Sequence, residues 1–169
     1  MELNDEIARV AAQEAALRLP RFDEAIAWRL GARLHGLAVE RRLAIAIEIR
    51  RCGQLLFHAA LPGTTPDNGD WIRRKGNVVT RFLRSSYAVG LSLQHKGGDL
   101  TSRYGLPGTD YASHGGAFPL NVEGAAVIGY VAVSGLPQRL DHELVVEALS
   151  AELGLIYLPP DGAVQALPT

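Results

Sequence analysis

Residues 43–61 read LAIAIEIRRCGQLLFHAAL, and this stretch decides the fold. In its first half, Leu43–Arg50, isoleucines alternate with alanine, glutamate and arginine. A period of two is typical of a strand with one buried face, so the pattern predicts a strand here. The turn signal Arg51-Cys52-Gly53 then leads into a returning strand over Gln54–Leu61, which completes a hairpin.

A second hairpin is predicted nearer the C-terminus. Its strands are Ala117–Val122 and Ala125–Ser134, and Glu123-Gly124 links them. Between the two hairpins, Thr65 and Pro66 open a helix whose apolar stripe reaches as far as residue 82. Threonine is a favoured N-cap residue, and proline fits the first helical position.

Four further segments have the apolar spacing of amphipathic helices. They are a first helix capped by Asn4 and stopped by Pro20, a second starting near Asp23, a short segment over Tyr87–Gln94 and a last helix over about Gln138–Leu153. The stretch His95–Gly116 is rich in glycine and is predicted to be a long loop. Loops of this length inside a domain often carry binding or catalytic residues.

The predicted element order is therefore ααββααββα. Two hairpins with helices between them indicate an α+β fold, in which helices pack on one antiparallel sheet. A small sheet beside a long loop is typical of the profilin/PAS-like architecture. Because no repeat or linker divides the chain, residues 1–169 are expected to form a single domain, with residues 159–169 as a frayed tail.

The composition excludes several classes of protein. Lys plus Arg number 17 against 18 for Asp plus Glu, so no nucleic-acid partner held by bulk positive charge is expected. The single cysteine, Cys52, excludes an intrachain disulfide and a site made of cysteines alone. No apolar run of about 18 residues exists, so no membrane span is expected. The acidic N-terminus lacks a signal peptide pattern, and a cytoplasmic location is expected.

The helix that follows the first hairpin is strongly basic. Its cationic residues are Arg73, Arg74, Lys75, Arg81 and Arg84. Arginine suits bidentate recognition of planar anions. Lys75 differs from the rest, because it falls in line with the apolar residues Trp71 and Val78. Such a lysine either extends along apolar surface to reach solvent or points into a pocket. Trp71 beside it could stack on a flat ligand or pack in a core or an interface.

Among the five histidines, His114 is the best candidate for binding a ligand. It ends the glycine-rich loop and precedes Gly115-Gly116, and glycine lets a backbone approach a ligand closely. The alternative is that His114 only hydrogen-bonds its own loop or a neighbouring subunit. The other four are expected to be structural on a strand (His58), exposed on helices (His35, His142) or a solvated loop end (His95). The sequence contains no H-x-x-x-H metal spacing, nucleophile elbow or P-loop.

Five strings together resemble the haem-degrading-domain family, also called GlcG/HbpS-like, and in particular its branch of small uncharacterised proteins. The strings are IEIRRCGQLLFHAALPGTTPDN (Ile47–Asn68), WIRRK (Trp71–Lys75), RSSY (Arg84–Tyr87), HGGAFPLNV (His114–Val122) and VSGLPQRLDHELVVEAL (Val133–Leu149). The resemblance runs from about Phe22 to Leu153. It implies a profilin-like fold and a homo-oligomer, and it names haem as a cofactor. Large apolar residues at Trp28, Phe118 and Tyr130 also favour assembly.

These observations lead to the hypothesis of an oligomeric protein that binds a flat or anionic small molecule, with haem as the named candidate. The pocket would lie between the basic helix and the loop. In it His114 would be a ligand or would orient one, Lys75 and Arg81 would be the anion partners, and Trp71 would be a wall. No residue is assigned as a catalyst, so an enzyme of another substrate class could use the same pocket. The alternative is a non-catalytic oligomeric interaction module without haem activity. The two are distinguished by whether Lys75 and His114 share one concave pocket.

Overall fold

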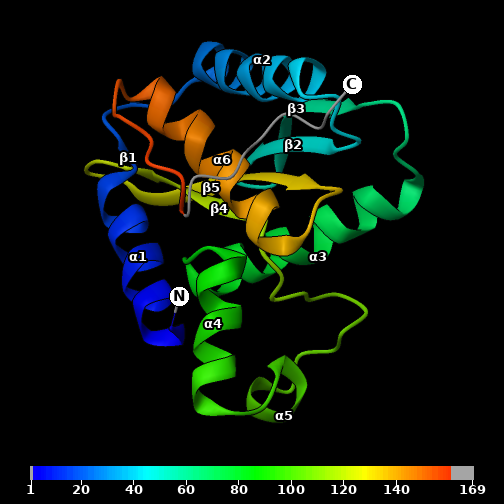
Figure 1. Cartoon of the computed structure of the whole chain (residues 1–169), viewed down its shortest axis with the longest axis vertical. Coiled ribbons are helices and arrows are strands. Elements are labelled where there is room, and N and C mark those ends of the chain that lie inside the picture. The colour runs from blue at the N-terminus through cyan, green and yellow to red at the C-terminus, as the bar shows by residue number, and fades with distance from the viewer. Residues whose placement is uncertain (1, 161–169) are drawn as a thin grey trace.

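The computed structural model describes residues 2–160, which form six helices and five strands (Figure 1). The elements are α1 (Leu3–Ala16), β1 (Arg18–Leu19), α2 (Glu24–Glu40), β2 (Ala46–Arg51), β3 (Gln54–Ala60), α3 (Pro66–Phe82), α4 (Ser86–Lys96), α5 (Leu100–Tyr104), β4 (Ala117–Val122), β5 (Ala126–Ser134) and α6 (Gln138–Glu152). The predicted α+β fold, with helices packed on one sheet, is confirmed. Most of the predicted tail, residues 159–169, lies outside the described residues.

The five strands form one sheet in the order β1-β4-β5-β2-β3. Both predicted hairpins are present, and β2 also pairs with β5 in antiparallel fashion. The β2–β3 turn is sharp because Cys52 and Gly53 both adopt positive φ angles, of 48° and 84°.

The alternation that predicts β2 separates two cores. Ile47 and Ile49 are fully buried on the face covered by α2 and α6, whereas Ala46 faces α3 on the other side. In Figure 1, α6 crosses in front of the sheet, and α4 and α5 extend away from it. The helix α3 packs mainly against β4 and β5, so it leaves part of β2 uncovered on its face of the sheet.

The beginning of the chain differs from the prediction in two details. The strand β1 has only two residues and pairs in parallel with β4, so the sheet is not wholly antiparallel. A strand this short carries no period that a sequence pattern could reveal. The first helix begins at Leu3, with Glu2 rather than Asn4 in the N-cap position.

The predicted loop His95–Gly116 is also partly helical. It contains the last turn of α4 and all of α5. The helix α5 starts with a capping box, in which Asp99 Oδ1 accepts from the Ser102 backbone N–H at 2.7 Å and Ser102 Oγ accepts from the Asp99 N–H at 2.9 Å. The glycine residues of this stretch therefore separate short elements, and residues 97–99 and 105–116 remain irregular.

Candidate functional site

The helix α3 places two of the candidate residues side by side. Its start is fixed by Asn68 Oδ1, which accepts a hydrogen bond from the Thr65 backbone N–H at 2.9 Å, and by Pro66 in the first turn. Because side chains four residues apart share one face of a helix, Trp71 and Lys75 are neighbours on it. Both line one cleft, together with His114 from the segment before β4.

Lys75 is buried, with 2% of its surface exposed, so the interpretation in which it reaches solvent is wrong. Its Nζ atom donates to Gly115 O at 3.0 Å, to Val133 O at 2.6 Å and to Asp141 Oδ2 at 3.1 Å. An ammonium group has three protons, and these three bonds use them all. Burial lowers the pKa of Lys75, and the carboxylate of Asp141 opposes that fall.

Two glycines make this close packing possible. A Cβ atom on Gly116, whose φ is +128°, would lie 2.4 Å from Lys75 Nζ and 2.5 Å from Val133 O. A Cβ atom on Gly115 would lie 2.1 Å from the backbone oxygen of Gln138, at the start of α6. In the chain itself, these glycines bring the loop close to α3, β5 and α6. No ligand is needed to explain them.

His114 is exposed beside this buried centre. Its ring makes an edge-to-face contact with Trp71, with 5.1 Å between ring centroids, and the Arg74 guanidinium lies 4.0 Å from the Trp71 ring. Partial burial, followed by the positive charges of Lys75 and Arg74, lowers the pKa of His114 from 6.5. The imidazole is therefore mainly neutral at pH 7, and a neutral imidazole can bind a metal or accept a proton.

We call the hollow beside these residues the Lys75–His114 cleft. It has a volume of about 270 Å³, and its polar lining includes Gln138 and Asp141 in addition to Lys75 and His114. A second hollow of about 240 Å³, bounded by α4, shares His114 and Gln138 with the first. His114 therefore stands on a ridge between two adjoining hollows.

The prediction that Arg81 belongs to this pocket is wrong. Arg81 is exposed and does not line the cleft. It follows Lys75 by six residues, which corresponds to about 9 Å along the helix axis and a rotation onto a different face. Of the four predicted site residues, the structure thus brings together Trp71, Lys75 and His114.

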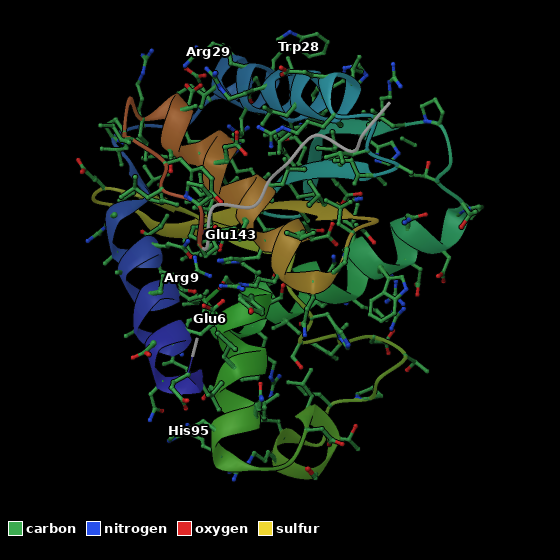
Figure 2. All side chains as sticks on the ribbon, viewed as in Figure 1. Glu6, Arg9, Trp28, Arg29, His95 and Glu143 are labelled. Atoms are coloured by element: carbon green, nitrogen blue, oxygen red, sulfur yellow. The ribbon has the colours of Figure 1, made fainter. Side chains whose placement is uncertain are left out.

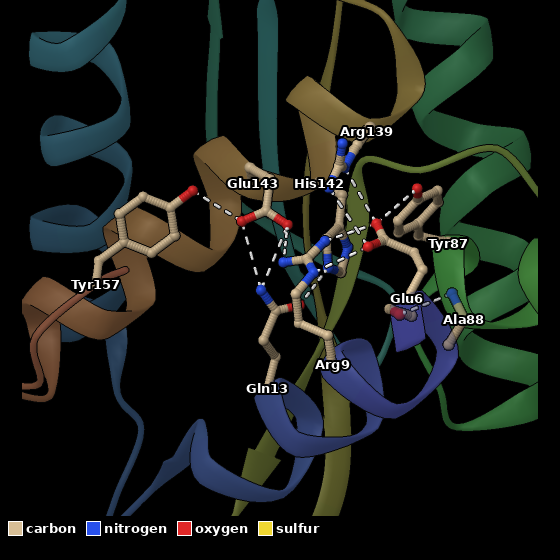
Figure 3. Close-up of polar contacts among 10 residues, drawn as sticks. Glu6, Arg9, Gln13, Tyr87, Ala88, Arg139, His142, Glu143 and Tyr157 are labelled. Atoms are coloured by element: carbon tan, nitrogen blue, oxygen red, sulfur yellow. Dashed lines mark hydrogen bonds and ion pairs between the residues drawn. The ribbon is translucent and has the colours of Figure 1, made fainter. Parts of the chain in front are cut away.

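A second prediction is corrected at His142, which is fully buried on α6 instead of exposed. Its Nε2 atom lies 2.9 Å from Gln13 Oε1, and the next residue, Glu143, accepts a hydrogen bond from Arg9 at 2.6 Å. Figure 3 shows both contacts within a polar network that α1 builds against α4 and α6. Burial lowers the pKa of His142 to about 3, so its ring is neutral at pH 7. No local pattern indicates this burial, because the covering helix α1 is distant in the chain.

The described residues, 2–160, contain no cluster of three or more histidine, cysteine, aspartate or glutamate side chains able to hold a metal ion. Within the same range, no helix combines the length and apolarity needed to cross a membrane.

Comparison with known proteins places this geometry in a family. The sequence model described as haem degrading protein HbpS-like matches residues 22–150. A UPF0303 protein from Burkholderia cenocepacia is 59% identical over 157 residues, covering 93% of this chain and 95% of that protein. The crystal structure of the Ybr137w protein superposes with a TM-score of 0.81 at 25% identity, covering 88% of this chain and 89% of that one. The crystal structure of a PduOC:heme complex has the same fold, with a TM-score of 0.65 at 15% identity over 77% of this chain and 94% of that one.

Proposed function

Because the chain belongs to the family of HbpS-like haem degrading proteins, we propose that it binds a flat, anionic small molecule at the Lys75–His114 cleft, with haem as the first candidate. The observation that carries this proposal is the setting of His114. It is an exposed imidazole with a lowered pKa, at the mouth of a cleft, between an aromatic ring and two cations. The haem complex of PduOC, a protein of the same fold, supports haem as the first ligand to test.

The residues present fit haem as a ligand held at the surface. His114 would hold the haem iron, because neutral imidazole is a common ligand of haem iron. Trp71 would flank the porphyrin, and Arg74 would bring positive charge toward its propionates. The cleft volume of about 270 Å³ is near the lower end of the range, roughly 300–1,000 Å³, found for pockets that enclose drug-sized ligands. We therefore propose that the cleft holds one face or edge of the porphyrin.

Lys75 has a different part in this proposal from the one that the sequence suggests. All three of its protons are donated within the chain, so it has none left for a propionate. It would act by holding the backbone next to His114 in place and by keeping the cleft electropositive. When bound, haem would supply iron-centred redox chemistry, and these side chains would hold and orient it.

A haemin titration followed in the Soret region tests the proposal. We expect saturable binding near one haem per chain, and we expect His114→Ala to weaken it by at least about tenfold. The matched control is His95→Ala, because His95 is an exposed histidine at the end of α4 that lines neither hollow (Figure 2). Equal affinities of the two variants would refute His114 as the donor.

The second candidate function, an oligomeric interaction module, is favoured by one observation. Trp28 is 66% exposed on the outer face of α2 (Figure 2) and packs edge-to-face on Phe57 of β3, the last strand of the sheet. Phe118 and Tyr130, which we expected to favour assembly as well, are buried in the chain's own cores. Mass measurement by light scattering tests this candidate. A homo-oligomer that Trp28→Ala dissociates, in a protein that does not bind haemin, would favour it over the first.

A further inference from the structure

Another cleft lies away from the site discussed above. It has a volume of about 760 Å³ and opens where α3 leaves β2 uncovered, beside the β2–β3 turn. We call it the Glu48 cleft, after the acidic residue in its floor. It shares no lining residue with the Lys75–His114 cleft, so its role is independent of the function proposed for that site.

The floor of the Glu48 cleft is a chain of three linked polar side chains on the sheet face that packs against α3. Tyr130 Oη donates to Glu48 Oε1 at 3.0 Å, and the Arg50 Nε–H pairs with the same oxygen. Arg50 Nη1 also donates to Gly53 O at 2.9 Å, which anchors the guanidinium to the turn. Burial and the neighbouring carboxylate raise the pKa of Tyr130, so the phenol keeps its proton and remains the donor.

Only one of the two carboxylate oxygens of Glu48 accepts hydrogen bonds within residues 2–160. The residue is 9% exposed and lines the cleft, and both hydrogen bonds that it accepts go to Oε1. Within residues 2–160, Oε2 accepts no hydrogen bond, and it is not sealed from solvent. A carboxylate oxygen in a cleft that accepts no hydrogen bond from the protein is free to accept one from a cationic N–H donor of a ligand.

Arg50 offers the complementary group on the same strand. Its guanidinium has five N–H donors, of which the bonds to Glu48 and Gly53 use two, and the side chain is 34% exposed. An arginine in this position suits a carboxylate. The floor thus presents a cation and an anion close together, and the pair has no net charge of its own.

The rest of the lining is mixed. Val127 lies on the β5 side and Leu83 at the end of α3, while Arg73, Asn77 and Thr80 of α3 add polar groups. Gly129 lets β5 approach β2 closely, because a Cβ atom there would lie 1.9 Å from Arg50 O. A ligand for this cleft therefore has a small apolar body and carries an ammonium group next to a carboxylate.

From this juxtaposition we infer that the Glu48 cleft binds a small zwitterion of the apolar α-amino acid class. The ammonium group pairs with Glu48 Oε2, the carboxylate pairs with Arg50, and the aliphatic side chain lies against Val127 and Leu83.

Calorimetric titration with L-leucine tests this inference. Two fragments serve as comparison ligands: isopentylamine lacks the carboxylate, and 4-methylpentanoate lacks the ammonium group. We expect saturable binding of leucine and at least about tenfold weaker binding of each fragment, since each loses one charge-assisted contact. Failure of leucine to bind, or equal binding of a fragment, would overturn the inference.

Two variants locate the binding. Glu48→Gln keeps an oxygen that accepts from Tyr130, but it replaces Oε2 with an NH₂ group that donates. An NH₂ group cannot accept a hydrogen bond from the ligand's ammonium group, so leucine affinity should fall by at least about tenfold. Glu40→Gln, an exposed change at the end of α2, is the control and should leave the affinity unchanged. If Glu48→Gln does not fold, Thr80→Trp decides instead, because exposed Thr80 lines the cleft and a tryptophan there would fill its mouth. Full leucine binding by a folded Thr80→Trp protein would overturn the assignment. The assignment would also be overturned if leucine does not bind and Thr80→Trp lowers the mass of the protein measured by light scattering. That outcome would identify the occupant of the cleft as a second copy of the chain.

Discussion

Lys75 of α3 and Asp141 of α6 form an ion pair of 3.1 Å between side chains that are 2% and 3% exposed. Asp141 Oδ1 also accepts from the Leu136 backbone N–H at 3.0 Å, while Lys75 donates to backbone oxygens on both sides of the cleft. A helix on one face of the sheet, a helix on the other face and the segment carrying His114 are thereby joined at one point. The pair determines the shape of the cleft more than it offers groups to a ligand.

Removing the ammonium group should destabilise the protein strongly. Lys75→Met leaves Asp141 charged and unpaired in the interior, and the loss of one partner of a buried pair lowers the free energy of unfolding by about 3–5 kcal/mol. Urea denaturation measures this loss. The chain has only one other lysine, Lys96, which is exposed, so Lys96→Met is the matched control and should change the free energy of unfolding by no more than about 0.5 kcal/mol. Similar losses in both variants would show that the pair contributes little.

A methyl group at Gly116 should destabilise the protein by a steric clash in addition to backbone strain. Gly116→Ala would place a Cβ atom 2.4 Å from Lys75 Nζ at a φ of +128°. Gly97, with a φ of +72°, has no atom within 4 Å of the same position, so Gly97→Ala reports strain alone. We expect Gly116→Ala to lower the free energy of unfolding by about 2 kcal/mol more than Gly97→Ala does. Equal losses would mean that the loop moves aside to admit the methyl group.

The sequence predicts the elements whose residues signal them locally. The strand β4 has the predicted bounds, Ala117–Val122, and α2 begins after Asp23, whose carboxylate accepts from the Ile26 backbone N–H at 2.8 Å. The helix α5 also has a local signal, the Asp99–Ser102 capping box. The glycines around it favour a loop, so the sequence predicts a loop there. Two-residue β1 depends entirely on its pairing with β4, and no spacing rule detects such a strand.

The sequence predicts the part of the candidate site that lies on one helix face, where Trp71 and Lys75 are neighbours. The apolar neighbours of Lys75 leave open whether its side chain reaches solvent or enters a pocket. Only the fold shows that Asp141 and two carbonyl oxygens accept its hydrogen bonds. The sequence predicts an exposed His142, whereas the structure buries it together with its neighbours Asp141 and Glu143. This burial is possible because three separate elements supply their partners: α3 for Asp141, and α1 with residue 157 for the other two.

His142 should make stability depend on pH. Its pKa is about 3 in the folded protein, mainly because of burial, and about 6.5 in the unfolded chain. Between these values the unfolded state binds more protons, so the stabilising contribution is present above pH 6.5 and is lost as the pH falls toward 3. We expect His142→Gln to reduce the slope of unfolding free energy against pH by up to about 1.4 kcal/mol per pH unit between pH 6 and pH 4.

Urea denaturation at several pH values measures that slope. His35→Gln, an exposed substitution on α2, is the control and should keep the slope of the unchanged protein. If His142→Gln also keeps that slope, the buried ring does not account for the loss of stability in acid.

The pKa of His114 should lie below that of an unperturbed histidine. Burial comes first among the causes, and the charges of Lys75 and Arg74 follow, so its pKa in the ligand-free protein lies below 6.5. An NMR titration of the ring protons measures it directly. Arg74→Gln removes one of these charges and should raise the midpoint. Arg73→Gln is the matched control, because the Arg73 guanidinium is held by Asp70 and Asp110 and does not act on His114.

The same titration predicts how haemin binding depends on pH. The neutral ring is the form that donates to iron, so affinity should stay at its full value down to about pH 6.5 and should fall only below the measured midpoint of His114. Protons then compete with iron for the same nitrogen, and the apparent affinity should drop about tenfold per pH unit below that midpoint. Haemin affinity that falls at a pH unrelated to the NMR midpoint would assign the donor to another residue. Agreement of the two midpoints, together with the loss in His114→Ala, would assign it to this ring.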